Sequence, residues 1–217
     1  MPWGDGTVDS KDLEVLMRYW QQEVLPASLI AYWKLDEADG VVAADRAGIS
    51  AGTLVGNPIW RPAGGKRAGA LEFDGLGSCV KTPFVCDPSQ SVFSAFAWVK
   101  GGAPGQVIVS QVNGANWLML APNGALMTEL KQSGRQGKPL TSSAVVTDGA
   151  WHRVGVAWDG VNRILYVDDL EVAKDTQTSL ANAFGGLYIG AGSTLAPGSF
   201  WSGLIDDVRI YDRAVKP

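Results

Sequence analysis

Residues 162–175, NRILYVDDLEVAKD, decide the fold class because two short β-type runs flank an acidic pair. The runs are rich in Ile, Leu, Tyr and Val, which favour strands. Asp168 and Asp169 separate the runs, and aspartate tolerates a positive φ better than most residues, as a tight turn requires. The stretch therefore predicts a β-hairpin that turns at these two aspartates.

Further β-type runs lie on both sides of this hairpin, roughly 8 to 12 residues apart and bounded by Gly, Pro, Asn or Asp. No stretch after Pro26 has helical periodicity. We therefore predict an all-β fold, a two-sheet antiparallel jelly-roll β-sandwich with a short N-terminal α-helix. The predicted strands include LIAYWKL, GALEFDG, SVFSAFAWVK, QVIVSQV, NWLMLAP, ALMTELK, WHRVGVAWDG, GLYIGA and GLIDDVRIYD.

Composition limits the partners of this chain of 217 residues. Its 46% apolar and 18% charged content, with 27 glycines, suits one sandwich with many turns. A net charge of −4 argues against binding nucleic acid, and no apolar run is long enough for a membrane helix. We expect no membrane insertion, no signal peptide in this sequence and a monomer.

The sequence has two cysteines, Cys79 and Cys86, seven positions apart. They are either free thiols or joined by a disulfide across a short loop, and the sequence leaves both alternatives open.

The first 26 residues differ from the rest. Leu13, Leu16, Met17 and Trp20 have the spacing of an amphipathic helix, which Pro26 ends. Before them, GDGTVDSKDL (residues 4–13) resembles the second half of a dockerin repeat, whose calcium loop is incomplete here. We therefore expect two domains, a dockerin-like remnant at 1–26 and a β-domain at 27–217, and no tight calcium binding by the remnant.

From residue 28 to residue 215 the order of the sequence pieces resembles the laminin G-like, concanavalin A-like jelly-roll family. The pieces are LIAYWKLDEADG, AADRAG, GTLVGNPIW, AGALEFDG, FSAFAWVK, DGAWHRVGVAWDG, LYVDDLEVA, LYIGAG and FWSGLIDDVRIYDRAV. The resemblance implies a noncatalytic extracellular module, often appended to bacterial enzymes or surface proteins. It also implies carbohydrate or protein recognition, sometimes with bound calcium.

An enzyme would need a catalytic constellation. Glycosidases of this fold class carry alternating carboxylates of the form ExDxxE, and the sequence has no such motif. Glu72 and Asp74 share one strand face but have no third acid nearby in sequence. His152 alternates with apolar residues, which favours a packed, hydrogen-bonded structural role over that of a catalytic base. We therefore predict that the chain is not an enzyme.

Four residues are candidates for ligand binding. Asn116 and Glu129 are polar residues near the middle of the predicted sheet, where they could hydrogen-bond a ligand. Trp117 and Trp201 lie close to turns, where an exposed indole ring could stack on a sugar. The alternative for the two tryptophans is core or rim packing.

Asp36 and Asp206 are candidate calcium ligands. Strict alternation along residues 205–211 places Asp206 on one face with Val208 and Ile210, and a buried carboxylate there needs a cation or several donors. Asp36 ends the first strand, and jelly rolls place the first and last strands side by side. We predict a structural Ca²⁺ between the two acids; the alternative is that Asp206 accepts bonds from backbone N–H groups or from an arginine such as Arg67.

These observations predict a noncatalytic recognition module of a secreted bacterial multidomain protein, located outside the cell or on its surface. Carbohydrate is the expected ligand. The alternative is a structural or adhesion module that binds an extracellular protein, and a glycoside hydrolase is the third hypothesis.

Overall fold

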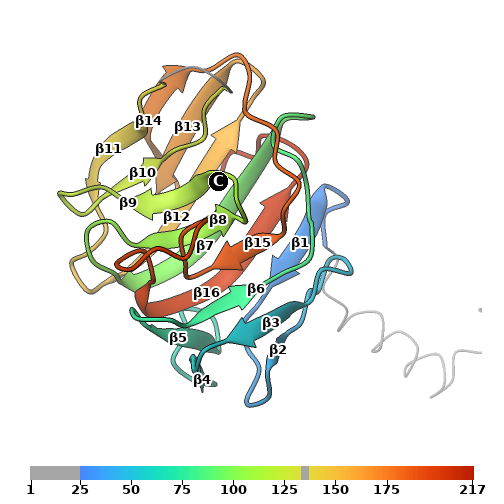
Figure 1. Cartoon of the computed structure of the whole chain (residues 1–217), viewed down its shortest axis with the longest axis vertical. Helices are drawn as coiled ribbons and strands as arrows, with labels where there is room; N and C mark the ends of the chain where they lie inside the picture. The colour runs from blue at the N-terminus through green and yellow to red at the C-terminus, as the bar shows by residue number, and fades with distance from the viewer. Residues whose placement is uncertain (1–24, 133–136) are drawn as a thin grey trace, which may run out of the picture.

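The computed structural model of this chain describes residues 25–132 and 137–217, where all regular elements are β-strands. Two antiparallel sheets pack face to face (Figure 1), which confirms the predicted all-β sandwich. The predicted helix and the dockerin-like segment fall mainly within residues 1–24 and lie outside the described residues. Within the described ranges, no helix is long and apolar enough to cross a membrane.

Each sheet has eight strands, and Figure 1 looks onto sheet B with sheet A behind it. Sheet A runs, in spatial order, β14 (Leu170–Thr176), β13 (Asn162–Val167), β12 (Trp151–Trp158), β7 (Phe93–Gly101), β16 (Ser202–Tyr211), β5 (Ala70–Asp74) and β4 (Ile59–Arg61), with β1 (Leu29–Trp33) also paired to β16. Sheet B runs β11 (Leu140–Val145), β10 (Ala125–Thr128), β9 (Asn116–Leu120), β8 (Val107–Gln111), β15 (Leu187–Ile189), β6 (Cys79–Lys81), β3 (Gly52–Val55) and β2 (Val42–Ala43).

The hairpin predicted from residues 162–175 is present as β13 and β14. Val167 pairs with Leu170 across the turn. Asp168 and Asp169 occupy the turn with φ values of 50° and 68°, so both adopt the left-handed backbone that this turn requires.

The main core lies between the two sheets and includes three fully buried tryptophans, Trp33, Trp117 and Trp201. The Trp33 indole N–H donates to the Ser50 carbonyl at 3.0 Å, which fixes the loop after β2 against β1. Cys79 is buried, Cys86 is half-buried, and both are free thiols.

Strand β16 does not follow the strict alternation predicted for it. Asp207 has a φ of 58° and the pairing with β7 shifts between Asp206 and Arg209, which marks a β-bulge. Ile205, Val208 and Ile210 consequently all lie in the core. The prediction that Asp206 shares a face with Val208 and Ile210 was wrong, because one extra residue in a strand moves the residues before it to the opposite face.

Candidate ligand-binding site

Asn116 and Glu129 lie side by side at one end of sheet B, where β8 ends, β9 begins and β10 ends. The Asn116 side-chain amide donates to the Glu129 carboxylate at 2.7 Å, and the Glu129 backbone N–H donates to the Asn116 carbonyl at 3.0 Å. The Asn116 Oδ1 atom accepts the backbone N–H of Ser193 at 3.0 Å. Asn116 is therefore held at both ends of its amide and fixes the position of the Glu129 carboxylate.

Glu129 lines a cavity of about 370 Å³, which we call the Glu129 cavity. Four segments enclose it: Pro88, the β8–β9 turn at residues 111–115, residues 129–132 and the loop at residues 181–183. Its polar lining includes Gln111, Asn113 and Asn182. The volume lies within the range of small-molecule sites, which combine an apolar surface with a few fixed polar groups.

Gln111 holds two walls of this cavity together. Its side-chain NH₂ faces the carbonyl oxygens of Cys86, Ala183 and Gly185 at 2.9, 3.3 and 3.0 Å. Because three acceptors surround the NH₂ group, the amide has one satisfactory orientation. Its Oε1 atom is then buried and has no hydrogen-bond partner among the described residues.

Asp87 contributes a second unmatched acceptor beside the loop at residues 181–183. One carboxylate oxygen accepts the backbone N–H groups of Ser89 at 3.0 Å and Ala183 at 3.2 Å. Burial raises the pKa of Asp87, but these hydrogen bonds outweigh burial and leave the pKa below its usual value. The other oxygen, Oδ2, is buried without a partner within the described part of the chain.

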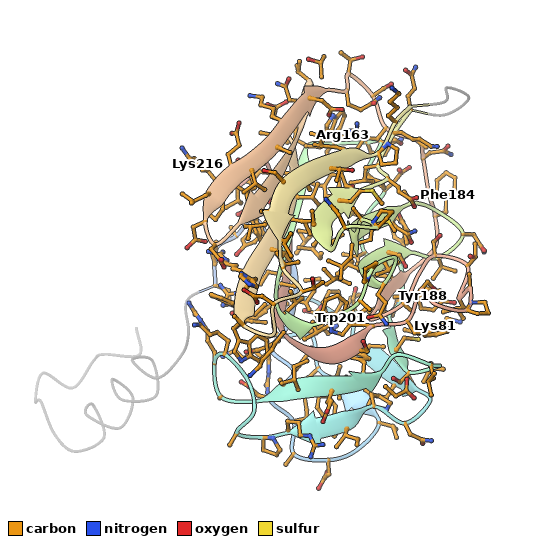
Figure 2. The ribbon with its side chains drawn as sticks, turned by 90° about the vertical axis from the view of Figure 1, so that its left-hand side faces the viewer. Lys81, Arg163, Phe184, Tyr188, Trp201 and Lys216 are labelled. Carbon is orange, nitrogen blue, oxygen red and sulfur yellow. The ribbon has the colours of Figure 1, made fainter. Side chains whose placement is uncertain are left out.

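Two exposed phenylalanines lie on the loops that Gln111 ties together. Phe184 directly follows the cavity-lining Ala183 and is 74% exposed, and Phe84 is 49% exposed. Figure 2 shows Phe184 at the outer side of the molecule, away from the core residue Trp201. Sequence reasoning missed both phenylalanines. The available signal was a single aromatic residue beside Pro or Gly in a loop, as in TPFVC and NAFGG.

Trp117 and Trp201 do not contribute to a binding surface. Both are fully buried, and the Trp117 ring packs against Phe93 with ring centroids 5.0 Å apart. Trp201 packs so closely against Gly102 that an added Cβ there would lie 2.4 Å from the indole. The expectation that these rings stack on a ligand is therefore corrected: nearness to a turn in sequence did not expose them.

Asp36 and Asp206 both bind the turn at residues 65–69. Asp36 accepts the Gly69 N–H at 2.7 Å, and Asp206 accepts the Arg67 N–H at 2.8 Å. Burial raises the pKa of Asp206 to about 7, and the nearby charges of Asp207 and Asp36 add to that rise. The Asp206 Oδ1 atom has no partner in the described residues.

No group of three or more His, Cys, Asp or Glu side chains within residues 25–132 and 137–217 is arranged to hold a metal ion. Calcium between Asp36 and Asp206 stays a prediction. The hydrogen bond expected as the alternative is present: Asp206 accepts from Arg67, and the donor is the backbone N–H of Arg67 rather than its side chain.

The residues considered for catalysis have local partners. Asp74 accepts three backbone N–H groups of the turn at residues 76–78, and although burial opposes it, these bonds lower its pKa to about 2. Glu72 forms an ion pair with Arg61. Both His152 ring nitrogens face carboxylates, Asp168 at 2.8 Å and Asp148 at 3.0 Å, as expected for a hydrogen-bonded histidine.

Comparison with known proteins adds a family match. The sequence of residues 73–217 matches the sequence model of the concanavalin A-like lectin/glucanases superfamily. No curated protein matches the chain.

Solved structures show the same fold. Domain 4 of AbnA, a GH43 extracellular arabinanase from Geobacillus stearothermophilus, has a structure in complex with arabinotriose. It is 20% identical to this chain with a TM-score of 0.63, and the match covers 87% of this chain and 94% of that one. The binding domain of Paraclostridial Mosquitocidal Protein 1 is 11% identical with a TM-score of 0.69 and is matched over 87% of this chain and 49% of its own length. Trypanosoma rangeli sialidase is 16% identical with a TM-score of 0.62, over 88% of this chain and 32% of the sialidase.

Proposed function

The chain belongs to the concanavalin A-like lectin/glucanases superfamily, and on that premise we propose that it is a noncatalytic module that binds carbohydrate in the Glu129 cavity. The observation that carries the proposal is the Glu129 carboxylate, which Asn116 holds in place at a cavity that Asn113 and Asn182 also line. A sugar hydroxyl donates to such a carboxylate and exchanges hydrogen bonds with the side-chain amides.

Other groups at the cavity suit the same ligand. The Glu129 carboxylate, fixed by Asn116, accepts hydroxyl hydrogens, and Asn182 offers both a donor and an acceptor. Phe184 directly follows the cavity-lining Ala183 and has an exposed ring, and an aromatic face packs well against the C–H groups of a sugar ring. The complex of the similar arabinanase domain with arabinotriose supports the choice of a neutral oligosaccharide.

The number of carboxyl groups at the cavity supports the noncatalytic part of the proposal. Hydrolysis of a glycosidic bond uses two carboxyl groups on opposite sides of that bond. Among the described residues that line the cavity, Glu129 is the one acid, and its carboxylate is bonded to Asn116. The likeness to a domain of an extracellular enzyme supports a location outside the cell or at its surface.

Calorimetry on the full chain tests this function with neutral trisaccharides, arabinotriose among them. We expect binding that Glu129→Gln weakens about tenfold, because a charge-assisted hydrogen bond becomes a neutral one. We expect the single variant Phe184→Ala to weaken trisaccharide binding more than Glu129→Gln does. Leu170→Ala, which removes an exposed apolar side chain at the start of β14, is the matched control and leaves affinity unchanged. Silence with every trisaccharide, or equal losses in Phe184→Ala and Leu170→Ala, would overturn the proposal.

A second candidate function is binding of a protein partner. Val41, Val42 and Ile59 are each at least half exposed and lie around a cavity of about 440 Å³ that includes Val41, Ile59 and Trp60. Exposed apolar groups that cluster in this way mark interaction surfaces. Capture of a specific protein by the wild type, lost in Ile59→Asp while trisaccharide binding stays unchanged, would support this function.

A further inference from the structure

A second cavity, of about 200 Å³, lies on the outer face of sheet A. Three arginines from three segments line it: Arg67 of the 65–69 turn, Arg153 of β12 and Arg209 of β16. Phe96 and Trp98 of β7 form part of the wall. We call this cavity the arginine pocket.

The strand register explains why these side chains converge. Arg153 lies opposite Trp98 across β12 and β7, and Arg209 lies opposite Phe96 across β16 and β7. Residues opposite each other in antiparallel strands point to the same face. Because Ala95 and Ala97 belong to the core between the sheets, Phe96 and Trp98 face outward, and the two arginines flank them.

Cationic groups dominate the surface of this pocket. In addition to the three arginines, the Lys66 ammonium lies 4.9 Å from the centre of the Trp98 ring. Asp207 pairs with Arg209 at 3.0 Å and lies 3.8 Å from Arg67. The residues that line the pocket therefore include three arginines and one carboxylate, that of Asp207.

The remaining carboxylates near the pocket are already engaged. Asp169 pairs with Arg153 at 2.7 Å at the rim. Asp206 and Asp36 lie beneath the turn and accept its backbone N–H groups.

One of the three arginines has an unmatched donor. The Arg209 guanidinium donates through one terminal nitrogen to Asp207 and to the Tyr32 hydroxyl at 2.9 Å, but its Nε atom is buried without a hydrogen-bond partner in the described chain. The Arg67 side chain is 66% exposed, so a bound group can reach its guanidinium. A guanidinium group carries five N–H donors in a planar fork that fits two oxygen atoms at once.

We propose that the arginine pocket binds a compact oxyanion, such as the carboxylate of an acidic sugar or an inorganic sulfate. An oxyanion accepts hydrogen bonds from the guanidinium groups that line the pocket, and its negative charge complements three arginines that share one lining carboxylate. The cavity is separate from the Glu129 cavity, so this site goes beyond the proposed function. The small volume of the arginine pocket suits a single anionic group rather than several units of a polysaccharide chain.

Titration of the ¹⁵N-labelled full chain with sodium sulfate and with glucuronate, each at constant ionic strength, tests this site. We expect the Arg209 Nε–H resonance to shift with at least one anion, and glucose to cause no shift. A response to sulfate alone identifies a site for free inorganic anions, a response to glucuronate identifies a site for acidic sugars, and both support the oxyanion class. Absence of a shift with either anion would overturn the proposal.

Variants make the assignment specific. Arg67→Gln removes an exposed guanidinium without burying a new group, and we expect it to weaken anion binding about tenfold. Arg213→Gln removes an exposed arginine outside the pocket and serves as the matched control. Equal losses in the two variants would show general charge attraction and contradict a defined site. Trisaccharide binding at the Glu129 cavity, measured in parallel, stays unchanged in Arg67→Gln, so the two proposals fail independently.

Discussion

The Glu129 cavity at the end of sheet B and the arginine pocket on sheet A differ in the polar groups that line them. The Glu129 cavity combines one carboxylate, that of Glu129, with side-chain amides that include those of Asn113 and Asn182. The arginine pocket combines three guanidinium groups with one carboxylate, that of Asp207. The first lining offers donors and acceptors to hydroxyl groups, and the second offers donors to an oxyanion.

The two sites also differ in how strongly they are tied to folding. Asp207 connects three elements, because it accepts from the Tyr32 hydroxyl of β1 and from Arg209 of β16 and lies near Arg67 of the turn. Among the described residues, Glu129 has one side-chain hydrogen-bond partner, Asn116. We therefore expect charge removal to unfold the protein more readily at the arginine pocket than at the Glu129 cavity.

The largest expected effect is that of Asp207→Asn. Asparagine keeps the size of the side chain and tolerates the positive φ of the bulge, but it leaves the mostly buried Arg209 without its counter-charge. We expect the free energy of unfolding to fall by about 3 kcal/mol, as when one partner of a buried ion pair is removed. Urea denaturation measures this change, and a loss below that of Glu129→Gln would contradict the comparison.

The next effect concerns pH and Asp206. Its pKa is raised to about 7 in the folded protein, so between pH 4 and pH 7 the folded state holds a proton that the unfolded state releases. Stability from this group is therefore greatest near pH 4 and falls as pH rises to 7, by up to about 1.4 kcal/mol per pH unit. The difference between wild type and Asp206→Asn in urea denaturation isolates this dependence from that of His152. A pH-independent difference would contradict the raised pKa.

A smaller effect tests calcium between Asp36 and Asp206. An ion that binds only the folded state raises the melting temperature, so the calcium proposal predicts that EDTA lowers it by several degrees. Asp206→Asn would melt lower than wild type and would not respond to EDTA. Unchanged melting of the wild type would assign Asp206 to the hydrogen-bonded role that its contact with Arg67 N–H shows.

The smallest expected effect on stability is that of Asn116→Ala. Asn116 is only half-buried, and its loss frees the Glu129 carboxylate and the Ser193 N–H, each close to solvent. We expect a loss of about 1 kcal/mol in unfolding free energy. Trisaccharide affinity falls more clearly, because the carboxylate is no longer positioned. Restored affinity in Asn116→Asp would contradict a positioning role for the amide N–H group.

Local features of the fold could be predicted from the sequence, whereas features that depend on distant contacts could not. The turn at Asp168 and Asp169 follows from residue chemistry alone. The bulge in β16 reversed the face of Asp206, and alternation contains no signal for an inserted residue. Gln111 acquires its role from carbonyl groups 25 to 74 positions away in sequence, so no local pattern marks it.

The same distinction applies to the ligand-binding residues. Asn116 and Glu129 are close in sequence and lie on neighbouring strands, and they were found as candidates. Phe184 follows Ala183, whose carbonyl faces the Gln111 side chain, and no strand pattern predicts this contact. Burial of Trp117 and Trp201 likewise depends on the opposite sheet and not on their distance from a turn.

The most direct test of carbohydrate binding in the Glu129 cavity is an NMR titration of the ¹⁵N-labelled full chain with the trisaccharide that binds best in calorimetry. The account predicts that the backbone amides of residues 111–115, 129–132 and 181–184 shift together, along with the Gln111 side-chain NH₂ signals. It also predicts that the amides of residues 65–69, at the arginine pocket, do not move. Shifts confined to another surface, or no shifts at saturating trisaccharide, would contradict it.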